Sequence, residues 1–418
     1  MTVMVFPNKI EGKIKAIPSK AHAHRLLIAS ALSQDETLIH LGESSLDIET
    51  TIQCLRAMGA DIEENDPLIR VQPIKRIKGV PLLDFNESGS SSRFLLPLGG
   101  ALLEEFLAKG AGRLPQRPLG DLIREMKKNG CSFSGEKLPF QVKGRLEGGR
   151  YFLPGDVSSQ YISGLLMALP LLEKDSLLHL TSLLESEGYV ALTLAVLEEY
   201  GILIKRVKEG YKIPGNQHYR TLGEKTVEGD WSNAAFFLAL GVLGGSVEVA
   251  GLNKASLQPD AEILTILEKM GADIEEKPNT IISKKRELKG VQVDLSQCPD
   301  LMPILAVILS VAKGKSEING GKRLRLKESD RIAVMARNLR TLGANVVEKD
   351  DGLDIIGVDN LRGGPVEGAN DHRIVMAMAV ASAISKGPIL ITDHQAVDKS
   401  YPGFFRDFEK VGGKSNVI

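Results

Sequence analysis

The sequence predicts a mixed α/β protein built from six similar segments of about 70 residues. The first observation is an internal repeat, because LRAMGADIEE, which ends at Glu64, is almost the same as LEKMGADIEE, which ends at Glu276. The second observation is a glycine that recurs at this period between a helix-like stretch and a strand-like one. These glycines are Gly59, Gly130, Gly201, Gly271, Gly343 and Gly412. Glycine suits the left-handed residue just past a helix end, so the spacing indicates six helix C-termini.

A polar turn followed by an apolar helix marks the beginning of each segment. The six turns, in chain order, are PSKAHAHR, ESGSSSR, GDVSSQ, EGDWSN, QCPD and NDHR. Serine, aspartate and asparagine are favoured N-cap residues, and stretches such as RLLIASAL and RIVMAMAVASAI follow them directly. We therefore expect every segment to open with a strand, a turn and a helix.

A second helix in each segment is also preceded by polar or charged residues. The six stretches are SSLDIE, QRPLG, ESEGY, LQPDAE, RLKESDR and DKSYPG. With the first set, this predicts twelve helix N-termini that carry polar or charged side chains.

Basic residues lie at many of these predicted N-termini, where the helix dipole disfavours positive charge. They are Lys20, Arg25, Arg93, Arg117, Lys327, Arg331, Arg373 and Lys399. For any single turn, simple capping explains the serines, aspartates and asparagines, but it does not explain the cations. A set of helix N-termini with added arginine and lysine is suited to binding phosphates and carboxylates, so we expect an anionic ligand.

The composition is typical of a globular protein of about two or three domains, with 418 residues, 43% hydrophobic and 25% charged. A formal net charge of -1 and 5% aromatic residues argue against nucleic-acid binding. No apolar stretch is long enough to span a membrane, and no signal peptide opens the sequence. The scattered cysteines Cys54, Cys131 and Cys298 favour neither a disulfide nor a zinc site. We expect a cytoplasmic protein with no membrane partner.

Several catalytic motifs fail when tested. The GKS at Gly314 to Ser316 has Leu309 where a phosphate-binding loop needs its first glycine. The sequence contains no dinucleotide-binding GxGxxG, no HExxH and no GxSxG, and the histidines form no cluster beyond His22 and His24. Metal, nicotinamide and serine-hydrolase chemistry are therefore not expected.

Nine motifs together resemble the 5-enolpyruvylshikimate-3-phosphate synthase family in order and spacing along the whole chain. They are PSKAHAHR, ESGSSSR, LPQRPL, GDVSSQ, ESEGY, VEGDWSNAAFFL, LKESDR, NDHR and DKSYP. The resemblance implies a two-domain inside-out α/β barrel built from six βαβαββ units. Residues 20–227 would form one domain and residues 1–19 with 228–418 the other, with the active site in the cleft between them. The repeat pattern alone would instead place one boundary near residue 223.

The resemblance also implies a reaction that requires no metal or organic cofactor. Carbon 3 of phosphoenolpyruvate is protonated, the 5-hydroxyl of shikimate 3-phosphate attacks carbon 2, and the adduct expels phosphate. Asp300 matches the base that takes the hydroxyl proton, while Lys20 and Glu328 match groups that transfer protons at the enolpyruvyl carbon and the leaving phosphate. Taken alone, a glutamate in KESDR is more commonly a residue of a first helical turn.

Binding residues carry over position by position. The shikimate 3-phosphate site would contain Lys20, Arg25, Ser158, Ser159, Gln160, Ser186, Tyr189, Asp300 and Lys327. The phosphoenolpyruvate site would contain Lys20, Gly89, Arg117, Gln160, Arg331, Arg373 and Lys399, flanked by Arg93 and His372. Glycine permits close backbone approach at Gly89, and planar guanidinium groups suit carboxylate and phosphate. We expect a monomer whose partners are these two small molecules.

Four positions depart from the commonest family pattern. Ala21 replaces a serine, Glu87 an asparagine, Ser90 a threonine and Arg323 an asparagine. Arg323 could supply charge that compensates for Ala21, and a solvated surface arginine is an equally fair interpretation.

Two alternatives remain open. The sister enzyme that transfers enolpyruvyl to UDP-N-acetylglucosamine shares the sixfold architecture but uses a loop cysteine, whereas Cys54 and Cys131 lie in or just after predicted helices and Cys298 precedes Pro299. A catalytically dead anion-binding homologue is the other. The presence of Lys20, Asp300, Glu328, Arg331 and Lys399 argues against it.

Overall fold

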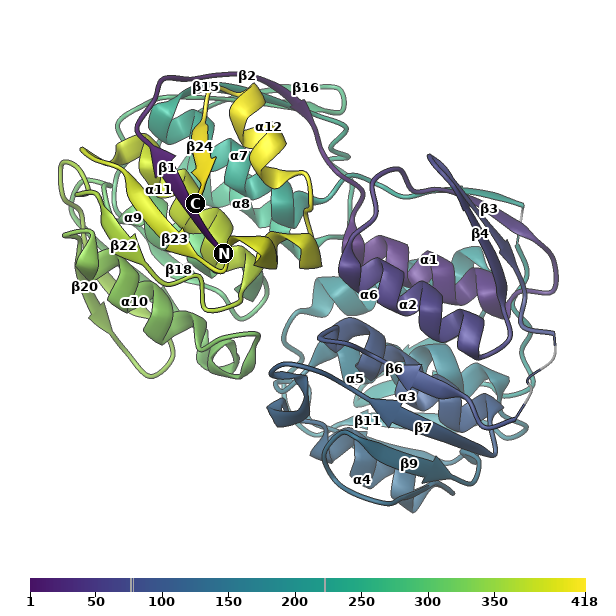
Figure 1. Cartoon of the computed structure of the whole chain (residues 1–418). Coiled ribbons are helices and arrows are strands. Elements are labelled where there is room, and N and C mark those ends of the chain that lie inside the picture. Colours follow the sequence, from purple (N-terminus) through teal and green to yellow (C-terminus); the bar gives the residue numbers. More distant parts are fainter. Residues whose placement is uncertain (76, 78, 222) are drawn as a thin grey trace. The chain divides into compact units, whose positions relative to one another are not determined.

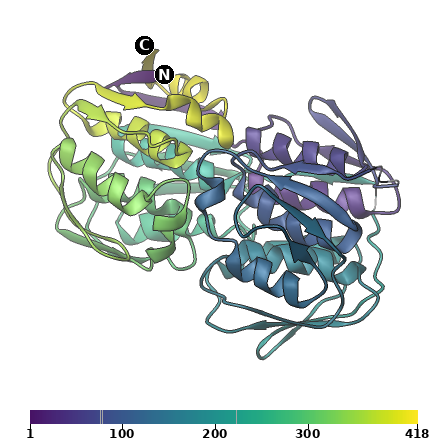
Figure 2. The same ribbon diagram turned by 60° about the horizontal axis from the view of Figure 1, so that its bottom comes forward.

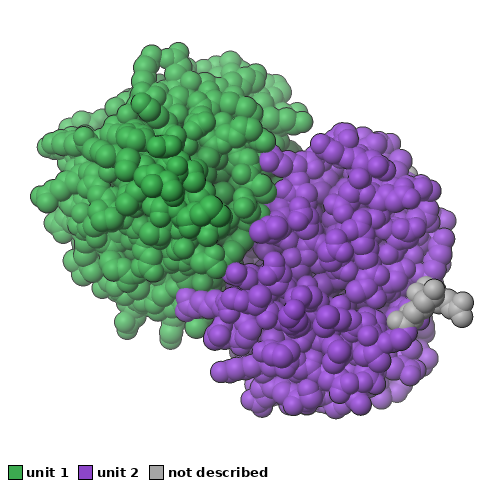
Figure 3. Space-filling view, in the orientation of Figure 1, with its two compact units in different colours: residues 1–19, 228–418 green, residues 20–227 purple. Residues whose placement is uncertain are grey.

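The computed structural model describes residues 1–75, 77, 79–221 and 223–418. The chain forms two compact units, which Figure 3 colours separately. Unit 1 comprises Met1–Ser19 and Glu228–Ile418, and unit 2 comprises Lys20–Val227. The chain therefore passes between the units at two places, Ser19–Lys20 and Val227–Glu228.

Unit 2 alternates helices with short strands. Its elements are α1 (Lys20–Leu32), β3 (Thr37–His40), α2 (Leu46–Ala57), β4 (Asp61–Asn65), β5 (Leu68–Gln72), β6 (Leu82–Asp84), α3 (Gly89–Leu102), β7 (Glu105–Lys109), η1 (Leu114–Gln116), α4 (Gly120–Lys128), β8 (Ser132–Phe133), β9 (Phe140–Lys143), β10 (Arg150–Leu153), α5 (Ser159–Ala168), η2 (Leu169–Leu171), β11 (Ser176–Leu180), α6 (Glu187–Glu199), β12 (Lys205–Val207), β13 (Gly210–Ile213) and β14 (Glu224–Thr226).

Unit 1 repeats the same alternation and includes the first two strands of the chain. Its elements are β1 (Thr2–Phe6), β2 (Ile10–Lys15), α7 (Trp231–Gly244), β15 (Gly245–Ala250), η3 (Pro259–Glu262), α8 (Ile263–Lys269), β16 (Asp273–Lys277), β17 (Thr280–Lys284), β18 (Gln292–Asp294), η4 (Pro299–Leu301), α9 (Met302–Leu309), β19 (Lys315–Asn319), η5 (Lys322–Leu326), α10 (Arg331–Thr341), β20 (Asn345–Glu348), β21 (Leu353–Ile356), β22 (Gly364–Val366), α11 (His372–Ala381), η6 (Ser382–Ile384), β23 (Ile389–Thr392), η7 (His394–Lys399), α12 (Phe404–Lys410) and β24 (Lys414–Val417).

The described strands form six separate four-stranded mixed sheets. In the sheet ordered β6-β7-β9-β8, β6 is parallel to β7, whereas β9 is antiparallel to both β7 and β8. The sheets β10-β11-β13-β12 and β18-β19-β21-β20 repeat this arrangement, which is that of a βαβαββ segment. The mixed α/β prediction is confirmed. Over the described residues the six sheets are open, and none closes on itself.

Three sheets each contain a strand from a distant part of the chain. Strand β14 pairs with β3, and β2 pairs with β15 over Ile10–Lys15. Strand β1 lies between β23 and β24, with Val3 opposite both Ile391 and Val417. Figures 1 and 2 show the two chain ends side by side as a result. The first strands of the sequence thus complete sheets whose other strands lie hundreds of residues away.

Each unit has its own hydrophobic core, in which the first helix of each segment is buried. Helix α7 is the clearest case, because every residue from Trp231 to Leu243 is buried. A helix that is apolar on all faces requires such surroundings. Helices α7, α9 and α11 pack against one another in unit 1 (Figure 1), and α3 packs against α5 in unit 2. The N-termini of these buried helices carry most of the predicted site residues.

Side-chain capping is confirmed at four predicted helix starts, and all six predicted helix ends carry their glycine. Side chains of Ser88, Asp230, Asp330 and Asp371 accept hydrogen bonds from backbone N–H groups at the starts of α3, α7, α10 and α11. All six repeat glycines have positive φ angles, from 76° at Gly201 to 105° at Gly130. The sixfold period therefore has the physical cause that the sequence suggested.

No helix among the described residues is both long enough and apolar enough to cross a membrane. The same residues contain no cluster of three or more histidine, cysteine, aspartate or glutamate side chains suited to a metal ion.

Candidate active site

In unit 2, the starts of α3 and α5 are joined by hydrogen bonds of the predicted site residues Arg93 and Gln160. The amide of Gln160 donates to Ser90 Oγ over 3.0 Å and accepts from Arg93 Nη1 over 3.1 Å. The two helices approach so closely that a Cβ on Gly164 would lie 2.2 Å from the carbonyl oxygen of Arg93. The structure thus brings Ser90, Arg93 and Gln160 together.

Gly89 lies against two guanidinium groups at the same place. A Cβ at this position would lie 2.4 Å from Arg93 Nη1 and 2.7 Å from Arg117 Nη1. Glycine is therefore needed for both arginines to lie against the first turn of α3. Arg93 and Arg117 are 4% and 9% exposed, so the two cations concentrate positive charge in a nearly enclosed place.

Arg25 is a buried cation held by neutral oxygens. Its Nε donates to Thr193 Oγ1 over 2.7 Å, while Nη1 and Nη2 donate to the carbonyl oxygens of Ala21 and Tyr189 over 2.6 and 2.9 Å. Burial lowers the pKa of Arg25 to about 10. Among the described residues it has no carboxylate partner, so its charge is left for another anion to balance.

Lys20 begins α1 and is paired with an acidic residue that sequence reasoning missed. Its Nζ lies 2.7 Å from Asp47 Oδ2 in the first turn of α2, and the two side chains are 16% and 13% exposed. The motif SSLDIE contains Asp47, but the sequence offered only a capping role for it. In the structure, the ion pair with Asp47 fixes the position of the Lys20 ammonium group.

The remaining predicted residues of unit 2 also lie at helix starts. Ser158 is the N-cap residue of α5 and Ser159 is its first residue. Ser186 is the N-cap of α6, in a left-handed conformation with φ of 53°, and Tyr189 lies in the first turn. The carbonyl oxygen of Tyr189 accepts a hydrogen bond from Arg25, so the guanidinium group of Arg25 lies beside the start of α6.

In unit 1, Asp300 lies among three predicted cations. Its Oδ1 is 2.8 Å from Arg331 Nη1 and 3.6 Å from Lys327 Nζ, and its Oδ2 is 3.2 Å from Arg373 Nη2. Arg373 also donates to the Asp300 carbonyl oxygen over 3.4 Å. Residues separated by up to 73 positions in the chain thus meet at one carboxylate.

Burial and charge act in opposite directions on this cluster. Burial alone would raise the pKa of Asp300, but Arg373, Lys327 and Arg331 hold it well below its usual range. Burial lowers the pKa of Lys327 to about 8, against the opposing effect of Asp300 and with a further contribution from Arg331. Asp300 is therefore ionised, while the charge on Lys327 depends on pH near neutrality.

Asp371 is the second acidic residue that sequence reasoning missed as a site residue. It was expected only as part of the NDHR turn, and it does cap α11 by accepting from Arg373 N. It also accepts from Arg331 Nε over 2.8 Å and from Ser329 Oγ over 2.9 Å. No sequence signal distinguishes this use of Asp371 from capping, because its partners lie about 40 positions earlier.

Glu328, Lys399 and His372 complete the unit 1 group. Glu328 accepts from Arg331 Nη2 over 2.7 Å and precedes the N-cap residue Asp330, so the interpretation as a first-turn residue is wrong. Lys399 ends η7, is 8% exposed and donates to the Asn370 carbonyl oxygen over 2.7 Å. His372 is the first residue of α11 and is 2% exposed.

Carboxylates of the protein itself lie beside several of the predicted cations. Lys20 is balanced by Asp47, and Asp300 is shared by Lys327, Arg331 and Arg373. Carboxylates of the protein itself therefore account for these four cations. Arg25 has no carboxylate partner among the described residues, so its charge calls for an anionic ligand.

The departures from the family pattern have specific places. The backbone oxygen of Ala21, not its side chain, bonds to Arg25. Ser90 serves as an acceptor for Gln160. Glu87 lies beside Gly112, whose Cβ would be 2.5 Å from the Glu87 carboxyl carbon. Arg323 donates to the Ser296 carbonyl oxygen and is not a solvated surface side chain.

All three cysteines are free and buried. Burial raises the pKa of the Cys54 and Cys131 thiols to about 12, and it raises the pKa of Cys298 as well. Because the thiolate is the reactive form, none of these cysteines is suited to act as a nucleophile.

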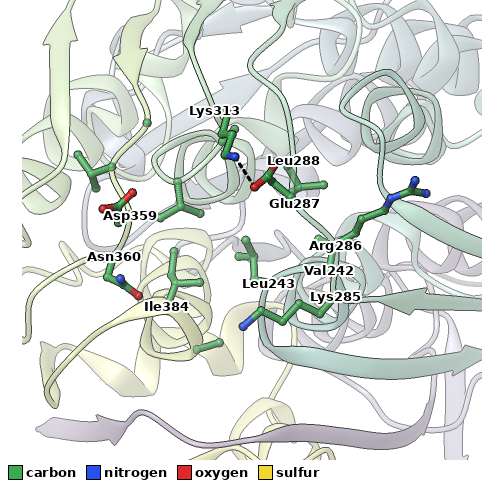
Figure 4. Close-up of a pocket in the computed structure, with 15 residues that line it drawn as sticks. Val242, Leu243, Lys285, Arg286, Glu287, Leu288, Lys313, Asp359, Asn360 and Ile384 are labelled. Atoms are coloured by element: carbon green, nitrogen blue, oxygen red, sulfur yellow. Dashed lines mark ion pairs between the residues drawn. The ribbon is translucent and has the colours of Figure 1, made fainter.

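A hollow of about 290 Å³ lies elsewhere in unit 1, and its lining contains none of the predicted site residues. Figure 4 shows it beside the C-terminal end of α7 at Leu243, with Lys313 and Glu287 forming an ion pair of 2.5 Å.

Comparison with known proteins gives a consistent result. Residues 5–408 match the family described as EPSP synthase (3-phosphoshikimate 1-carboxyvinyltransferase). A 3-phosphoshikimate 1-carboxyvinyltransferase of Clostridium kluyveri is 41% identical over 417 residues, covering 99% of this chain and 97% of that relative. The one of Clostridium acetobutylicum is 42% identical over 421 residues, covering 98% and 97%.

Solved structures show the same fold. The EPSP synthase of Acinetobacter baumannii has a TM-score of 0.83 at 24% identity and covers 100% of both chains. The enolpyruvyl transferase NikO of Streptomyces tendae has a TM-score of 0.80 at 16% identity, covering 99% of this chain and 98% of that chain.

Proposed function

Because the chain belongs to the EPSP synthase family, we propose that the two groups of residues described above bind and process one pair of anionic substrates. The chain transfers the enolpyruvyl group of phosphoenolpyruvate to the 5-hydroxyl of shikimate 3-phosphate and releases phosphate, a step of the shikimate pathway to aromatic amino acids. The assignment of individual residues to this reaction is our proposal.

The observation that carries the substrate assignment is the unbalanced charge of Arg25. Its side chain is held in place by three neutral oxygens and has no carboxylate partner among the described residues. We assign it to shikimate 3-phosphate, together with Lys20, Lys327, Asp300 and the helix-start residues Ser158, Ser159, Gln160, Ser186 and Tyr189. A phosphate or carboxylate beside Arg25 would gain a charge-assisted hydrogen bond in a weakly solvated place.

We assign phosphoenolpyruvate to the guanidinium groups that lie close to glycine or to acidic residues. Arg117 lies beside Gly89, and Arg331 and Arg373 bond to Asp300. Guanidinium forks match both the carboxylate and the phosphate of this substrate. The assigned residues are Lys20, Gly89, Arg117, Gln160, Arg331, Arg373 and Lys399, with Arg93 and His372 beside them.

Asp300 is the proposed base for the 5-hydroxyl proton. While it is bonded to three cations its low pKa makes it a weak base. Substrate anions that bond to Lys327 and Arg373 weaken this stabilisation and add negative charge nearby, which raises the pKa of Asp300. Substrate binding would thus prepare the base that the reaction requires.

Lys20 and Glu328 are the proposed groups for proton transfer at carbon 3 and at the leaving phosphate. Each is oriented by an opposite charge, Lys20 by Asp47 and Glu328 by Arg331. Fixed orientation matters because a misplaced proton donor loses most of its effect on rate. The cations around them would stabilise the charge of the tetrahedral adduct as it expels phosphate.

Phosphate release measured with phosphoenolpyruvate and shikimate 3-phosphate tests the function directly. We expect turnover with this acceptor and none with UDP-N-acetylglucosamine. The raised thiol pKa values of the three buried cysteines support this choice, because the sister enzyme uses a loop cysteine. Turnover with UDP-N-acetylglucosamine alone would overturn the proposal. A cytoplasmic location and a monomeric state belong to the same proposal, and light scattering during size-exclusion chromatography tests the latter.

A further inference from the structure

Gln258 uses one side-chain amide to hold both passages of the chain between the units. Its Oε1 accepts from Ser19 Oγ over 3.0 Å and from Trp231 N over 3.1 Å, and its Nε2 donates to the Gly229 carbonyl oxygen over 2.8 Å. The residue is 3% exposed. It lies in the loop between β15 and η3, within the stretch LQPDAE, but it is not one of the predicted site residues.

The two chain segments that Gln258 holds are also bonded to each other. Ser19 N donates to the Glu228 carbonyl oxygen and Asp230 N donates to that of Ile17, each over 2.8 Å. These segments end where the chain leaves unit 1 at Ser19 and re-enters it at Glu228. Gln258 therefore fastens the residue that directly precedes Lys20.

The chemistry at this place requires both an acceptor and a donor on one side chain. Trp231 N is the first N–H of α7, which has no acceptor within its own helix. Gly229 has no space for a side chain, because a Cβ would lie 2.3 Å from the Gly251 carbonyl oxygen. A glutamine amide supplies both functions at this crowded point, whereas an apolar residue of similar size supplies neither.

The backbone of Gln258 is fixed to the same segment. Gln258 N donates to Ser256 Oγ over 3.1 Å, and that hydroxyl donates to Glu228 Oε1 over 3.0 Å. The amide is thus anchored at both ends, and a displacement of Gln258 displaces Ser19 and the start of α7 together.

We propose that Gln258 is a positioning residue for enolpyruvyl transfer, which fixes through Ser19 the point where α1 begins and hence the place of the Lys20 ammonium. This proposal rests on the role given to Lys20 above. It predicts an effect on the chemical step from a residue that touches neither substrate.

The variant Gln258→Leu removes all three side-chain hydrogen bonds with little change in size. We expect kcat to fall roughly 10- to 100-fold, because a displacement of about 1 Å of a catalytic group has effects of this order. The KM for each substrate should change by less than about threefold, since most binding cations are untouched. Circular dichroism and thermal unfolding show whether the variant is folded at the assay temperature.

Asn338 offers a matched control in unit 1. Its amide is 2% exposed, donates to the Glu367 carbonyl oxygen over 2.8 Å and accepts from Glu367 N over 3.1 Å. Asn338→Leu should lower thermal stability to a similar degree but leave kcat within about twofold of the wild type. Equal losses of kcat in both variants would show that Gln258 acts through stability alone and would overturn the proposal.

A double-mutant cycle with Ser19→Ala tests whether Gln258 acts through Ser19. We expect Ser19→Ala to lower kcat by itself and Ser19→Ala/Gln258→Leu to be no slower than Gln258→Leu. A double variant whose loss is the product of the two single losses contradicts this route. If Gln258→Leu does not fold, an unchanged kcat in Ser19→Ala overturns the proposal.

The wild-type assay separates this inference from the proposed function. A wild-type protein that releases no phosphate from phosphoenolpyruvate and shikimate 3-phosphate refutes the proposed function. An active wild type whose kcat is unaffected by Gln258→Leu refutes only the role of Gln258.

Discussion

The Nε atom of Arg331 lies 2.8 Å from Asp371 Oδ2, and the two side chains are 1% and 0% exposed. A second bond of 3.2 Å joins Arg331 Nη2 to Asp371 Oδ1. The two bonds together fix the orientation of the guanidinium group. Because Asp371 also caps α11, one carboxylate fixes both Arg331 and the helix turn that carries Arg373.

Asp371→Asn should weaken phosphoenolpyruvate binding and lower the stability of the protein. Removing one partner of a buried ion pair lowers the stability of a protein by about 3–5 kcal/mol. In this variant Arg331 also loses the carboxylate that positions it. We expect the KM for phosphoenolpyruvate to rise more than that for shikimate 3-phosphate, measured by initial rates alongside urea unfolding.

Asp407→Asn is the control for this variant. Asp407 is 5% exposed and bonds to Tyr401 Oη over 2.9 Å and to Lys410 Nζ over 2.7 Å, neither of which is a predicted site residue. It should lower stability without changing either KM. Unchanged kinetics in Asp371→Asn, with stability lowered in both, would show that Asp371 has no part in binding.

Asp300→Ala should abolish turnover while both substrates still bind. The variant loses the proposed base, while Arg331 and Arg373 keep their positive charge and Lys327 loses the carboxylate that opposes the lowering of its pKa by burial. Isothermal titration calorimetry should therefore show that shikimate 3-phosphate still binds, whereas phosphate release falls to background. A variant that turns over at a near-normal rate is incompatible with Asp300 as the base.

The affinity for shikimate 3-phosphate should fall as the pH rises from 7 to 9. Burial lowers the pKa of Lys327 to about 8, so the charged ammonium predominates below this pH and is lost above it. The second ionisation of a phosphate monoester, with a pKa of about 6, is already complete in this range. Dissociation constants measured across the range should rise in the wild type and stay nearly flat in Lys327→Arg. Equal pH dependence in the two proteins would exclude Lys327 as its origin.

Arg117→Lys should weaken phosphoenolpyruvate far more than shikimate 3-phosphate. An ammonium cannot reproduce the two-pronged contact of the guanidinium that lies against Gly89, so the KM for phosphoenolpyruvate should rise about tenfold or more. Arg113→Lys, in the same loop but exposed, should leave both constants unchanged. Equal weakening of both substrates by Arg117→Lys would contradict the division of the two binding sites.

Two repeat glycines allow backbone strain to be separated from crowding. Gly201 has φ of 76° and no atom within 4 Å of the place where a Cβ would lie, whereas a Cβ on Gly130, at φ of 105°, would lie 2.1 Å from the Arg145 carbonyl oxygen. Gly201→Ala should cost about 1–2 kcal/mol from the left-handed conformation alone, and Gly130→Ala clearly more. Chemical unfolding of the two variants measures the difference, and a larger loss of stability for Gly201→Ala would show that crowding at Gly130 is relieved at little cost.

Local features of the fold could be read from the sequence because each depends on neighbouring residues. Gly59 and its five counterparts end helices with positive φ, and Asp230 and Asp371 cap helices as their turns indicated. The pairing of Val3 with Ile391 could not be read in this way, since the period of 70 residues says nothing about which segment a terminal strand joins. The pattern placed a single boundary, near residue 223, and for this reason missed the other passage between the units at Ser19–Lys20.

The cations of the site could be predicted, but their partners could not. Arginine at a helix N-terminus is unusual on its own, so Arg25 and Arg331 were conspicuous in the sequence. Asp47 and Asp371 occupy positions where acidic residues are ordinary, and only the packing of α1 against α2 and of α10 beside α11 reveals their pairing. Gln258 belongs to the stretch LQPDAE, but nothing in that stretch indicated its role, because the role depends on two chain segments that meet only after folding.

The position of β1 between β23 and β24 has a consequence for the way the protein is made. On the ribosome, residues 20–227 can emerge and pack their own core early. Thr2–Phe6 cannot pair until its partner strands Ile389–Thr392 and Lys414–Val417 have been synthesised, and these come last. The growing chain must therefore carry an apolar, unpaired strand through almost the whole of translation. This sheet of unit 1 can form only when translation ends. The first strand to be synthesised is therefore one of the last to pair.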